Sequence, residues 1–389
     1  MGFFFTFSSF LAVIYAYTGF RLIPSLFKGK KAMGAWVILT FLFLILIVHI
    51  YFRHSHLNPY LTQTLAWTGY SGLGLISYLF CMAFARDLLI IPSVTFLKIR
   101  QFLSPQPKQV QPSLERRKFL YKASSTAILL MGGPIAGIGT FFALQKPKVI
   151  QVTIPLKEEF KNLTGLTLVQ FTDLHIGPTI GYRYVKKICD TIKTLNADII
   201  VFTGDLADGS PSDLAHAVSP LMDLWAPFGK FFVTGNHEYY SGAERWINQV
   251  KILGYQPLLN EHRVIEYNNG LLTLAGVTDI RAEVFFPHHR SSPEAAIKGA
   301  PKNSYKLLLA HRPTSVYDAA DAGFDLQLSG HTHGGQYFPF EYFVKLQHPF
   351  IKGMYQHRQT QVYVNQGTGY WGPPLRLGTF PEITLFKFI

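Results

Sequence analysis

The stretch that decides the fold is DIIVFTGDLADG, residues 198–209. Its apolar run, Ile199–Phe202, stops at a Thr-Gly-Asp sequence. A short run rich in Ile and Val and closed by Gly and Asp is typical of a strand that is buried on both faces, as in sheets covered by helices. Two carboxylates, Asp205 and Asp208, follow directly. The stretch therefore predicts a buried strand with acidic side chains where it ends.

Seven more segments of the C-terminal part show the same short apolar runs. They are LTLVQFTD (166–173), GKFFVTGNH (229–237), GLLTLAGVTD (270–279), YKLLLAHRP (305–313), FDLQLSGHTH (324–333), QVYVNQG (361–367) and EITLFKF (382–388). Helical spacing of apolar residues between 182 and 196, and again from Trp246 to Leu253, indicates intervening helices. Strands that alternate with helices predict a layered α/β domain over residues 146–389.

Residues 1–145 have a different composition. Gly2–Phe20, Ala32–Phe52, Leu57–Ala85 and Ala123–Gln145 contain no Asp, Glu, Lys or Arg. About 20 apolar residues in a helix cross a hydrocarbon core, so we predict four transmembrane helices at about 2–20, 32–52, 60–85 and 123–144. The chain is then an integral membrane protein, and the lipid bilayer is a partner.

The basic residues predict an orientation. They concentrate in the first loop and in the linker 86–122, which the positive-inside rule assigns to the cytoplasm. The domain 146–389 is then predicted on the extracytoplasmic side. Within the linker, the Pro- and Gln-rich sequence from Leu103 to Lys122 predicts a loose connection. Arg116 and Arg117 either resemble a signal for the twin-arginine export machinery, a possible partner, or merely hold a basic loop inside.

The net charge of +13 does not indicate a nucleic-acid partner. Much of the basic excess lies beside the membrane spans, where it faces anionic lipid. The two cysteines, Cys81 in a span and Cys189 in a helical pattern, are not expected to pair. The domain is therefore predicted to depend on its own core.

Polar side chains follow five of the predicted strands. They are Asp173, His175, Asp205, Asp208, Asn236, His237, His311, His331 and His333. The carboxyl ends of strands in an α/β domain converge on one edge, where ligands bind. Oxygen and imidazole ligands suit Mn, Fe or Zn, and one carboxylate can bridge two such ions. The pattern predicts two divalent metal ions that activate water to hydrolyse a phosphoester.

The five motifs, in this order from Leu166 to Ile389, resemble the calcineurin-like metallophosphoesterases. The segments GNHEYYSGAERW, GHTHGGQ and YVNQGTGYWGPPLRLGTFPEITLF resemble the bacterial membrane-anchored or twin-arginine-exported branch, although the first three spans exceed its usual single segment. The resemblance implies a four-layer αββα sandwich. It implies that Asp173, His175 and His333 hold one metal, that Asn236, His311 and His331 hold the other, and that Asp205 bridges them. It also implies that His237 contacts the phosphate or protonates the leaving oxygen, oriented by Asp208.

The substrate is less well defined by the sequence. Arg376 can reach a substrate phosphate, since a planar guanidinium suits that group, or it packs a loop. We expect a membrane-bound phosphohydrolase for a phosphorylated small molecule or lipid, with phosphodiesters or pyrophosphates of an envelope substrate favoured. Two alternatives stay open: a UDP-2,3-diacylglucosamine-type nucleotide-lipid hydrolase, whose substrate faces the cytoplasm, and a non-catalytic membrane sensor that binds a phosphorylated ligand.

Overall fold

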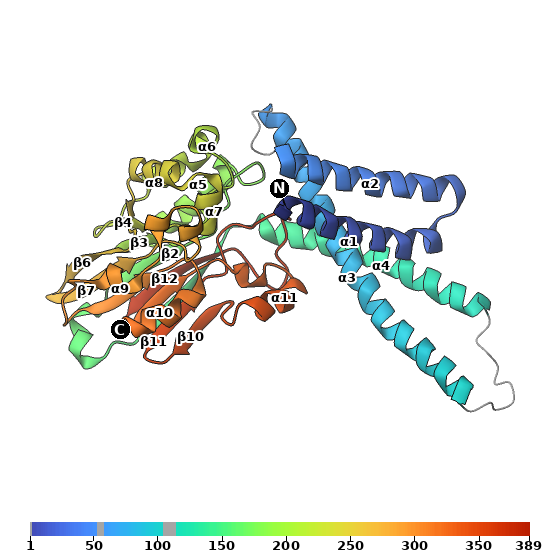
Figure 1. Ribbon diagram of the computed structural model, residues 1–389. Coiled ribbons are helices and arrows are strands. Elements are labelled where there is room, and N and C mark those ends of the chain that lie inside the picture. Colours follow the sequence, from blue (N-terminus) through green and yellow to red (C-terminus); the bar gives the residue numbers. More distant parts are fainter. Residues whose placement is uncertain (1, 53–57, 104–113) are drawn as a thin grey trace. The chain divides into compact units, whose positions relative to one another are not determined.

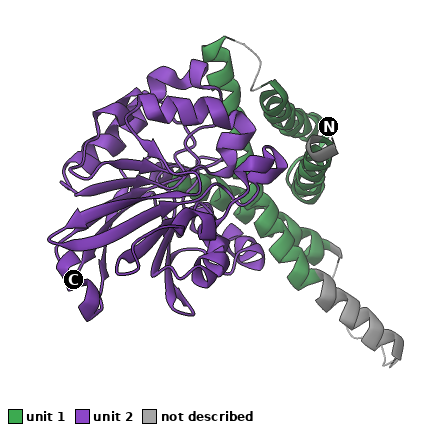
Figure 2. Ribbon diagram, turned by 60° about the vertical axis from the view of Figure 1, so that its left-hand side comes forward, with its two compact units in different colours: residues 1–139 green, residues 140–389 purple. Residues whose placement is uncertain are grey.

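The computed structural model describes residues 2–52, 58–103 and 114–389, with side chains for 5–52, 58–90 and 115–389. The chain divides into two compact units, residues 1–139 and 140–389, called here the N-terminal and C-terminal units (Figure 2).

Long helices account for the described part of the N-terminal unit. They are α1 (Gly2–Leu26), α2 (Gly29–Phe52), α3 (Pro59–Leu103) and α4 (Leu114–Ala143), whose last residues enter the C-terminal unit (Figure 1). Each contains a segment long and apolar enough to span a membrane: Phe5–Leu26, Gly29–Phe52, Pro59–Ile90 and Glu115–Ala143. The four predicted spans are confirmed as candidate membrane helices.

The predicted linker is shorter in the structure than the sequence suggests. Helix α3 continues to Leu103 and α4 begins at Leu114, so the prediction of a loose connection is wrong for residues 114–122. The helix-breaking composition is concentrated in residues 104–113, which lie outside the described residues. Helices α3 and α4 extend into the predicted linker because each residue added to a formed helix gains one backbone hydrogen bond.

A cluster of paired charges lies among the helices of the N-terminal unit. Asp87 of α3 is buried and accepts hydrogen bonds from Tyr17 Oη and Arg21 Nε of α1, both at 2.5 Å. Its other oxygen accepts from Arg86 Nε at 3.1 Å, and Arg86 also donates to Ser125 of α4 at 2.8 Å. A buried carboxylate is costly without such partners. The cluster therefore links three helices.

The C-terminal unit contains two six-stranded sheets, in the orders β1-β12-β2-β3-β4-β5 and β10-β11-β9-β8-β7-β6 (Figure 1). The strands are β1 (Lys148–Ile154), β2 (Thr167–Phe171), β3 (Ile199–Phe202), β4 (Lys230–Phe232), β5 (Gln256–Pro257), β6 (Glu261–Tyr267), β7 (Gly270–Gly276), β8 (Tyr305–Leu309), β9 (Leu326–Ser329), β10 (Gly353–His357), β11 (Thr360–Val364) and β12 (Glu382–Phe388). The α-helices are α5 (Tyr182–Lys193), α6 (Pro211–Val218), α7 (Asn236–Ser241), α8 (Ala243–Ile252), α9 (Pro293–Ile297), α10 (Val316–Asp321) and α11 (Phe340–Gln347).

Three apolar cores separate four layers. Because strand side chains alternate between faces, Val169 of β2 packs with α5 and α8, whereas its neighbour Leu168 packs against the other sheet. Leu274 of β7 lies in the same inter-sheet core, and Ala275 packs towards α9 and α10. The order helix, sheet, sheet, helix confirms the predicted αββα sandwich.

All eight strands predicted from apolar runs are present, and the sequence misses β1, β5, β6 and β10. All four are outermost in their sheets: β1 and β5 in the first sheet, β10 and β6 in the second. Edge strands are half exposed and alternate apolar with polar residues, as in EHRVIEY of β6. They therefore lack the continuous apolar run that marks a central strand.

Buried hydrogen bonds connect the two sheets. Gln170 of β2 donates to the carbonyl of Ser329 in β9 at 3.0 Å. Tyr363 Oη of β11 donates to Glu382 Oε1 of β12 at 2.7 Å. These bonds fix the ends of the strands that carry the polar loops, since a buried polar group is costly unless it is paired.

We expect Tyr363→Phe to lower the free energy of unfolding by about 1–2 kcal/mol, because Glu382 loses a buried donor while the ring remains. Thermal unfolding of the detergent-solubilised protein measures the effect. Tyr317→Phe is the control, since that ring is 42% exposed. Equal midpoints for the two variants would show that the inter-sheet bond does not stabilise the fold.

Candidate two-metal site

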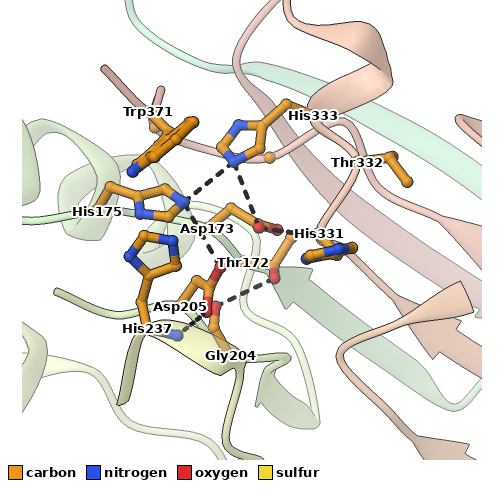
Figure 3. A network of polar contacts seen from close by, with 12 residues as sticks. Thr172, Asp173, His175, Gly204, Asp205, His237, His331, Thr332, His333 and Trp371 are labelled. Carbon is orange, nitrogen blue, oxygen red and sulfur yellow. Dashed lines mark hydrogen bonds and ion pairs between the residues drawn. The ribbon is translucent and has the colours of Figure 1, made fainter. Parts of the chain in front are cut away.

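Five loops carry the polar side chains identified in the sequence. β2 leads to Asp173 and His175, β3 to Asp205 and Asp208, β4 to Asn236 and His237, β8 to His311, and β9 to His331 and His333. The first three strands belong to one sheet and the last two to the other. Figure 3 shows side chains from the loops after β2, β3, β4 and β9 lying close together, and His311 from the β8 loop contacts Asp205 and His331. Both sheets therefore contribute to a single site.

Several of these residues have a left-handed backbone conformation. The φ angles are 54° for Asp173, 49° for His175, 58° for Asp205, 72° for His331 and 51° for His333. Such a conformation costs a non-glycine residue about 1–3 kcal/mol and persists only where the surroundings impose it. Strain at five positions of one site is typical of functional geometry that the rest of the fold supports.

Neighbouring glycines let the loops approach one another. A Cβ atom on Gly330 would lie 2.1 Å from Asp173 Oδ2, and one on Gly235 would lie 2.2 Å from Asp205 Oδ1. Both contacts are far too short for a side chain. These two glycines are therefore required by the packing of the loops against the carboxylates.

Carboxylates also hold the loops in place through backbone N–H groups. The N–H of His331 donates to both oxygens of Asp173, each at 3.0 Å. Fully buried Glu238 accepts from the N–H groups of Gly235 at 2.6 Å, Leu206 at 2.7 Å and Asp205 at 3.0 Å. Sequence analysis did not identify Glu238, although it directly follows the predicted Asn-His pair.

The first cluster of possible metal ligands contains Asp173, His175 and His333, whose ligand atoms all lie within 4.8 Å of one another. The two Nε2 atoms of His175 and His333 are 3.0 Å apart. His333 Nε2 lies 3.5 Å from Asp173 Oδ1. This is the set that the family resemblance assigns to one metal.

The second cluster contains Asp205, His311 and His331. His311 Nε2 lies 3.1 Å from Asp205 Oδ2 and 3.1 Å from His331 Nδ1. Asn236 adjoins this cluster, because its Oδ1 and His331 Nε2 both contact the guanidinium of Arg312, at 3.1 Å and 3.0 Å. The structure thus brings together all the side chains assigned to the second metal.

One oxygen belongs to both clusters. Asp205 Oδ2, besides its contact with His311, lies 3.7 Å from His175 Nε2 of the first cluster. The other oxygen of Asp205 accepts the backbone N–H of His237 at 2.9 Å. Asp205 therefore occupies the position of a carboxylate that can bridge two ions.

His237 and Asp208 form a pair beside the first cluster. His237 Nδ1 makes a short contact with Asp208 Oδ1, and Asp208 Oδ2 lies 3.3 Å from His175 Nδ1. Burial alone would lower the pKa of His237, but the carboxylates of Asp208 and Asp205 outweigh it and raise the pKa to about 9. Burial would raise the pKa of Asp208, but His237 and His175 hold it well below its ordinary value. The pair is thus a protonated imidazole beside an ionised carboxylate.

The imidazoles of the clusters differ in their pKa values. Burial would lower the pKa of His311, but the carboxylates of Asp205 and Asp173 outweigh it and raise the pKa to about 10. Burial, with the nearby His311, lowers the pKa of His331 well below its ordinary value, and burial with His175 does the same for His333. Burial raises the pKa of Asp173 by more than the nearby His311 lowers it, and the carboxylate of Asp205 raises it further. Neutral imidazoles keep a free nitrogen lone pair for a cation.

This donor set fits two divalent cations. Each cluster offers two imidazoles and a carboxylate, a combination that Mn, Fe and Zn accept. A cation in each would compensate the buried carboxylates. The ligand types do not distinguish among the three metals.

Arg376 differs from its sequence-based interpretation as a substrate-binding residue. The side chain is fully buried, and its Nη1 donates to the carbonyls of His333 and Gln366 at 2.8 and 2.7 Å. Its Nη2 donates to the carbonyl of Gly369 and lies 3.2 Å from His333 Nδ1. Both terminal nitrogens of the guanidinium therefore have partners within the protein. Arg376 holds the His333 loop in place, and its buried position does not favour contact with a substrate.

Comparison with known proteins agrees with this geometry. Residues 166–335 match the model of the calcineurin-like phosphoesterase family. The chain is 33% identical over 290 residues to an uncharacterized metallophosphoesterase of Bacillus subtilis, YkuE, covering 70% of this chain and 97% of that protein.

Two vertebrate relatives are named transmembrane protein with metallophosphoesterase domain. The identity is 37% over 264 residues for that of Danio rerio and 36% over 295 residues for that of Bos taurus. The matches cover 66% and 73% of this chain, but only 60% and 66% of those proteins. Among solved structures, GAP50, the anchor in the inner membrane complex of Plasmodium, is similar with a TM-score of 0.35 at 14% identity, over 53% of this chain and 72% of that one. With its two ligand clusters and these relatives, the chain belongs to the calcineurin-like phosphoesterase family.

Proposed function

We propose that the chain is a membrane-bound two-metal phosphohydrolase that cleaves phosphodiester or pyrophosphate bonds of a lipid or envelope substrate. The observation that carries the proposal is Asp205 Oδ2, which is shared between the two ligand clusters. When bound, two divalent ions polarise the phosphoryl oxygens and lower the pKa of the attacking water. The first ion would be held by Asp173, His175 and His333, the second by Asn236, His311 and His331, and Asp205 would contact both.

His237 is the proton donor in this proposal. Its imidazolium is stabilised by Asp208, which also fixes the ring through the short Nδ1 contact. The proton on the other ring nitrogen is then available to the oxygen that leaves phosphorus. General acid catalysis of this kind contributes about 10²–10⁴-fold to a rate.

Aromatic side chains beside His237 favour an apolar leaving group. The rings of Tyr240 and Trp371 lie 5.3 Å and 5.8 Å from the imidazole, centroid to centroid, and Phe285 lies 5.8 Å from Tyr240. These three side chains are 44–47% exposed. Exposed aromatic area beside a reacting group suits an apolar or flat substituent, such as the glycerol and acyl part of a lipid. Figure 3 shows Trp371 next to His175 and His237.

Two other functions are separable from this one. A sensor that only binds a phosphorylated ligand needs neither a complete set of metal ligands nor a proton donor. The two ligand clusters and the His237–Asp208 pair therefore favour a hydrolase. A nucleotide-lipid hydrolase would need the C-terminal unit in the cytoplasm, whereas the basic loops favour the extracytoplasmic side and leave twin-arginine export as a possible route. Labelling of a cysteine introduced into the C-terminal unit, from either side of sealed vesicles, distinguishes the orientations.

Asp205→Asn is expected to reduce kcat by roughly 10³-fold, or about 4 kcal/mol, because the shared carboxylate supports both metals. A panel of metal-reconstituted assays with a phosphodiester, a phosphomonoester, a glycerophospholipid and a UDP-linked acylated sugar measures the loss. The control is Asp190→Asn, whose carboxylate is half exposed and pairs with Lys186. Wild-type turnover in Asp205→Asn, or in metal-depleted protein, would contradict the proposal.

We expect Asp208→Asn to lose activity at a lower pH than the wild-type protein does on the alkaline side of the pH profile. The protonated His237 is the active form, and its pKa of about 9 depends on the Asp208 charge. Without that charge the pKa falls, so the proton is lost at lower pH and the alkaline limb of kcat/KM moves to lower pH. Profiles of kcat/KM against pH, recorded at saturating metal concentration, test this prediction. An unshifted alkaline limb in the variant would exclude His237 as the acid that the limb reports.

Trp371→Ala should lower kcat/KM roughly tenfold for a long-chain phospholipid and little for a glycerophosphodiester without acyl chains, since loss of about 1.5 kcal/mol of apolar contact affects only the first. Trp225→Ala is a matched control, because Trp225 is 77% exposed and lies outside the site. Equal losses for the two substrates would argue against an acyl chain at this position.

A further inference from the structure

We propose that Arg312, which sequence analysis did not single out, binds the phosphoryl group of the substrate. The inference rests on the proposed hydrolase function and deepens it by naming the residue that recognises the anion. Arg312 directly follows His311 at the end of β8, so its backbone is fixed by a strand that also carries a metal ligand. Its side chain is only 11% exposed.

A buried carboxylate holds one side of the guanidinium. Arg312 Nε donates to Asp279 Oδ2 at 2.8 Å. Asp279 is itself buried, and its second oxygen accepts the backbone N–H of Arg281 at 2.9 Å. Both carboxylate oxygens are therefore used, which orients the plane of the guanidinium. Its two terminal nitrogens face away from Asp279.

These terminal nitrogens lie at the second ligand cluster. Nη2 donates to Asn236 Oδ1 at 3.1 Å, and Nη1 lies 3.0 Å from His331 Nε2. An arginine only donates hydrogen bonds. The contact between Arg312 Nη1 and His331 Nε2 is therefore a hydrogen bond only while that nitrogen carries a lone pair.

A cation in the second cluster changes this contact. The nitrogen of His331 that faces the cluster is Nδ1, 3.1 Å from His311 Nε2. An imidazole that gives one nitrogen to a metal carries its proton on the other. With a cation held through Nδ1, His331 Nε2 would carry the proton and would not accept from Arg312. Independently of that proton, Nη1 and Nη2 both lie within 3.1 Å of atoms of the second cluster's residues, where an anion bound to a cation would be within their reach.

A phosphoryl oxygen is the anion that fits. The terminal nitrogens of a guanidinium form a planar fork that matches two oxygens of a phosphoryl group, and charge-assisted bonds of this kind are strong. The terminal nitrogens of Arg376, by contrast, donate to backbone carbonyls. Of these two arginines, Arg312 is the one whose fork faces ligand atoms.

The test uses full-length protein in detergent, reconstituted with Mn, and inorganic phosphate as the ligand in calorimetric titrations. We expect Arg312→Met to weaken phosphate binding at least about tenfold while metal content stays at the wild-type value, and Arg312→Lys to lose less. Arg281→Met is the matched control, since Arg281 is an exposed arginine of the neighbouring loop that contributes only its backbone N–H to Asp279.

Two outcomes would overturn the proposal. Unchanged phosphate affinity in Arg312→Met would show that the fork does not bind the anion. Loss of metal from that variant would make Arg312 a positioning residue for Asn236 and His331. The titration needs no turnover, so Arg312-dependent phosphate binding by a wild-type protein that hydrolyses nothing in the panel would support this inference and reject the hydrolase function.

Discussion

Asp205 shares one carboxylate oxygen between imidazoles from both sheets, 3.1 Å from His311 and 3.7 Å from His175. To occupy that position it adopts a left-handed backbone with a φ of 58°. Gly235 leaves room for its side chain, and Glu238 accepts its N–H. A strained residue in a buried position is retained only when several contacts hold it. The loops after β3 and β4 supply these contacts, so the fold of the first sheet and the site depend on each other.

The same carboxylates explain why metal ions complete the structure. Asp173, Asp205 and Glu238 are buried within one group of loops, and burial is the first cause that raises the pKa of Asp173 and of Glu238, the latter to about 7. Isolated carboxylates are costly to bury. The histidines compensate part of this charge and two divalent ions would compensate the rest. The buried carboxylates and imidazoles are therefore a donor set that suits bound cations.

How much of this the sequence could predict depends on the distance along the chain over which each interaction acts. The central strands and the ligands at their ends were predictable, because an apolar run and the residue after it are local signals. Arg312 was not, since its role depends on Asp279 and Asn236, which are 33 and 76 positions away. For the same reason the sequence left two interpretations of Arg376 open, because its carbonyl partners come from loops that the sequence does not place beside it. Glu238 carried a signal that was overlooked, as its neighbours Asn236 and His237 already marked the loop.

The end of helix α4 makes direct contacts within the C-terminal unit. The last residues of α4, Thr140–Ala143, belong to the C-terminal unit, and Ala143 packs in the core between the first sheet and its helices. Tyr184 Oη lies 3.4 Å from the Ala143 carbonyl and donates to Thr368 O at 3.0 Å.

Thr368 in turn donates its N–H to Thr172 O at 2.8 Å, one residue before Asp173. Only four residues separate α4 from β1, so the chain offers no long flexible tether at this point. The loop that carries Asp173 is therefore connected to the end of α4 through the contacts of Tyr184 and Thr368.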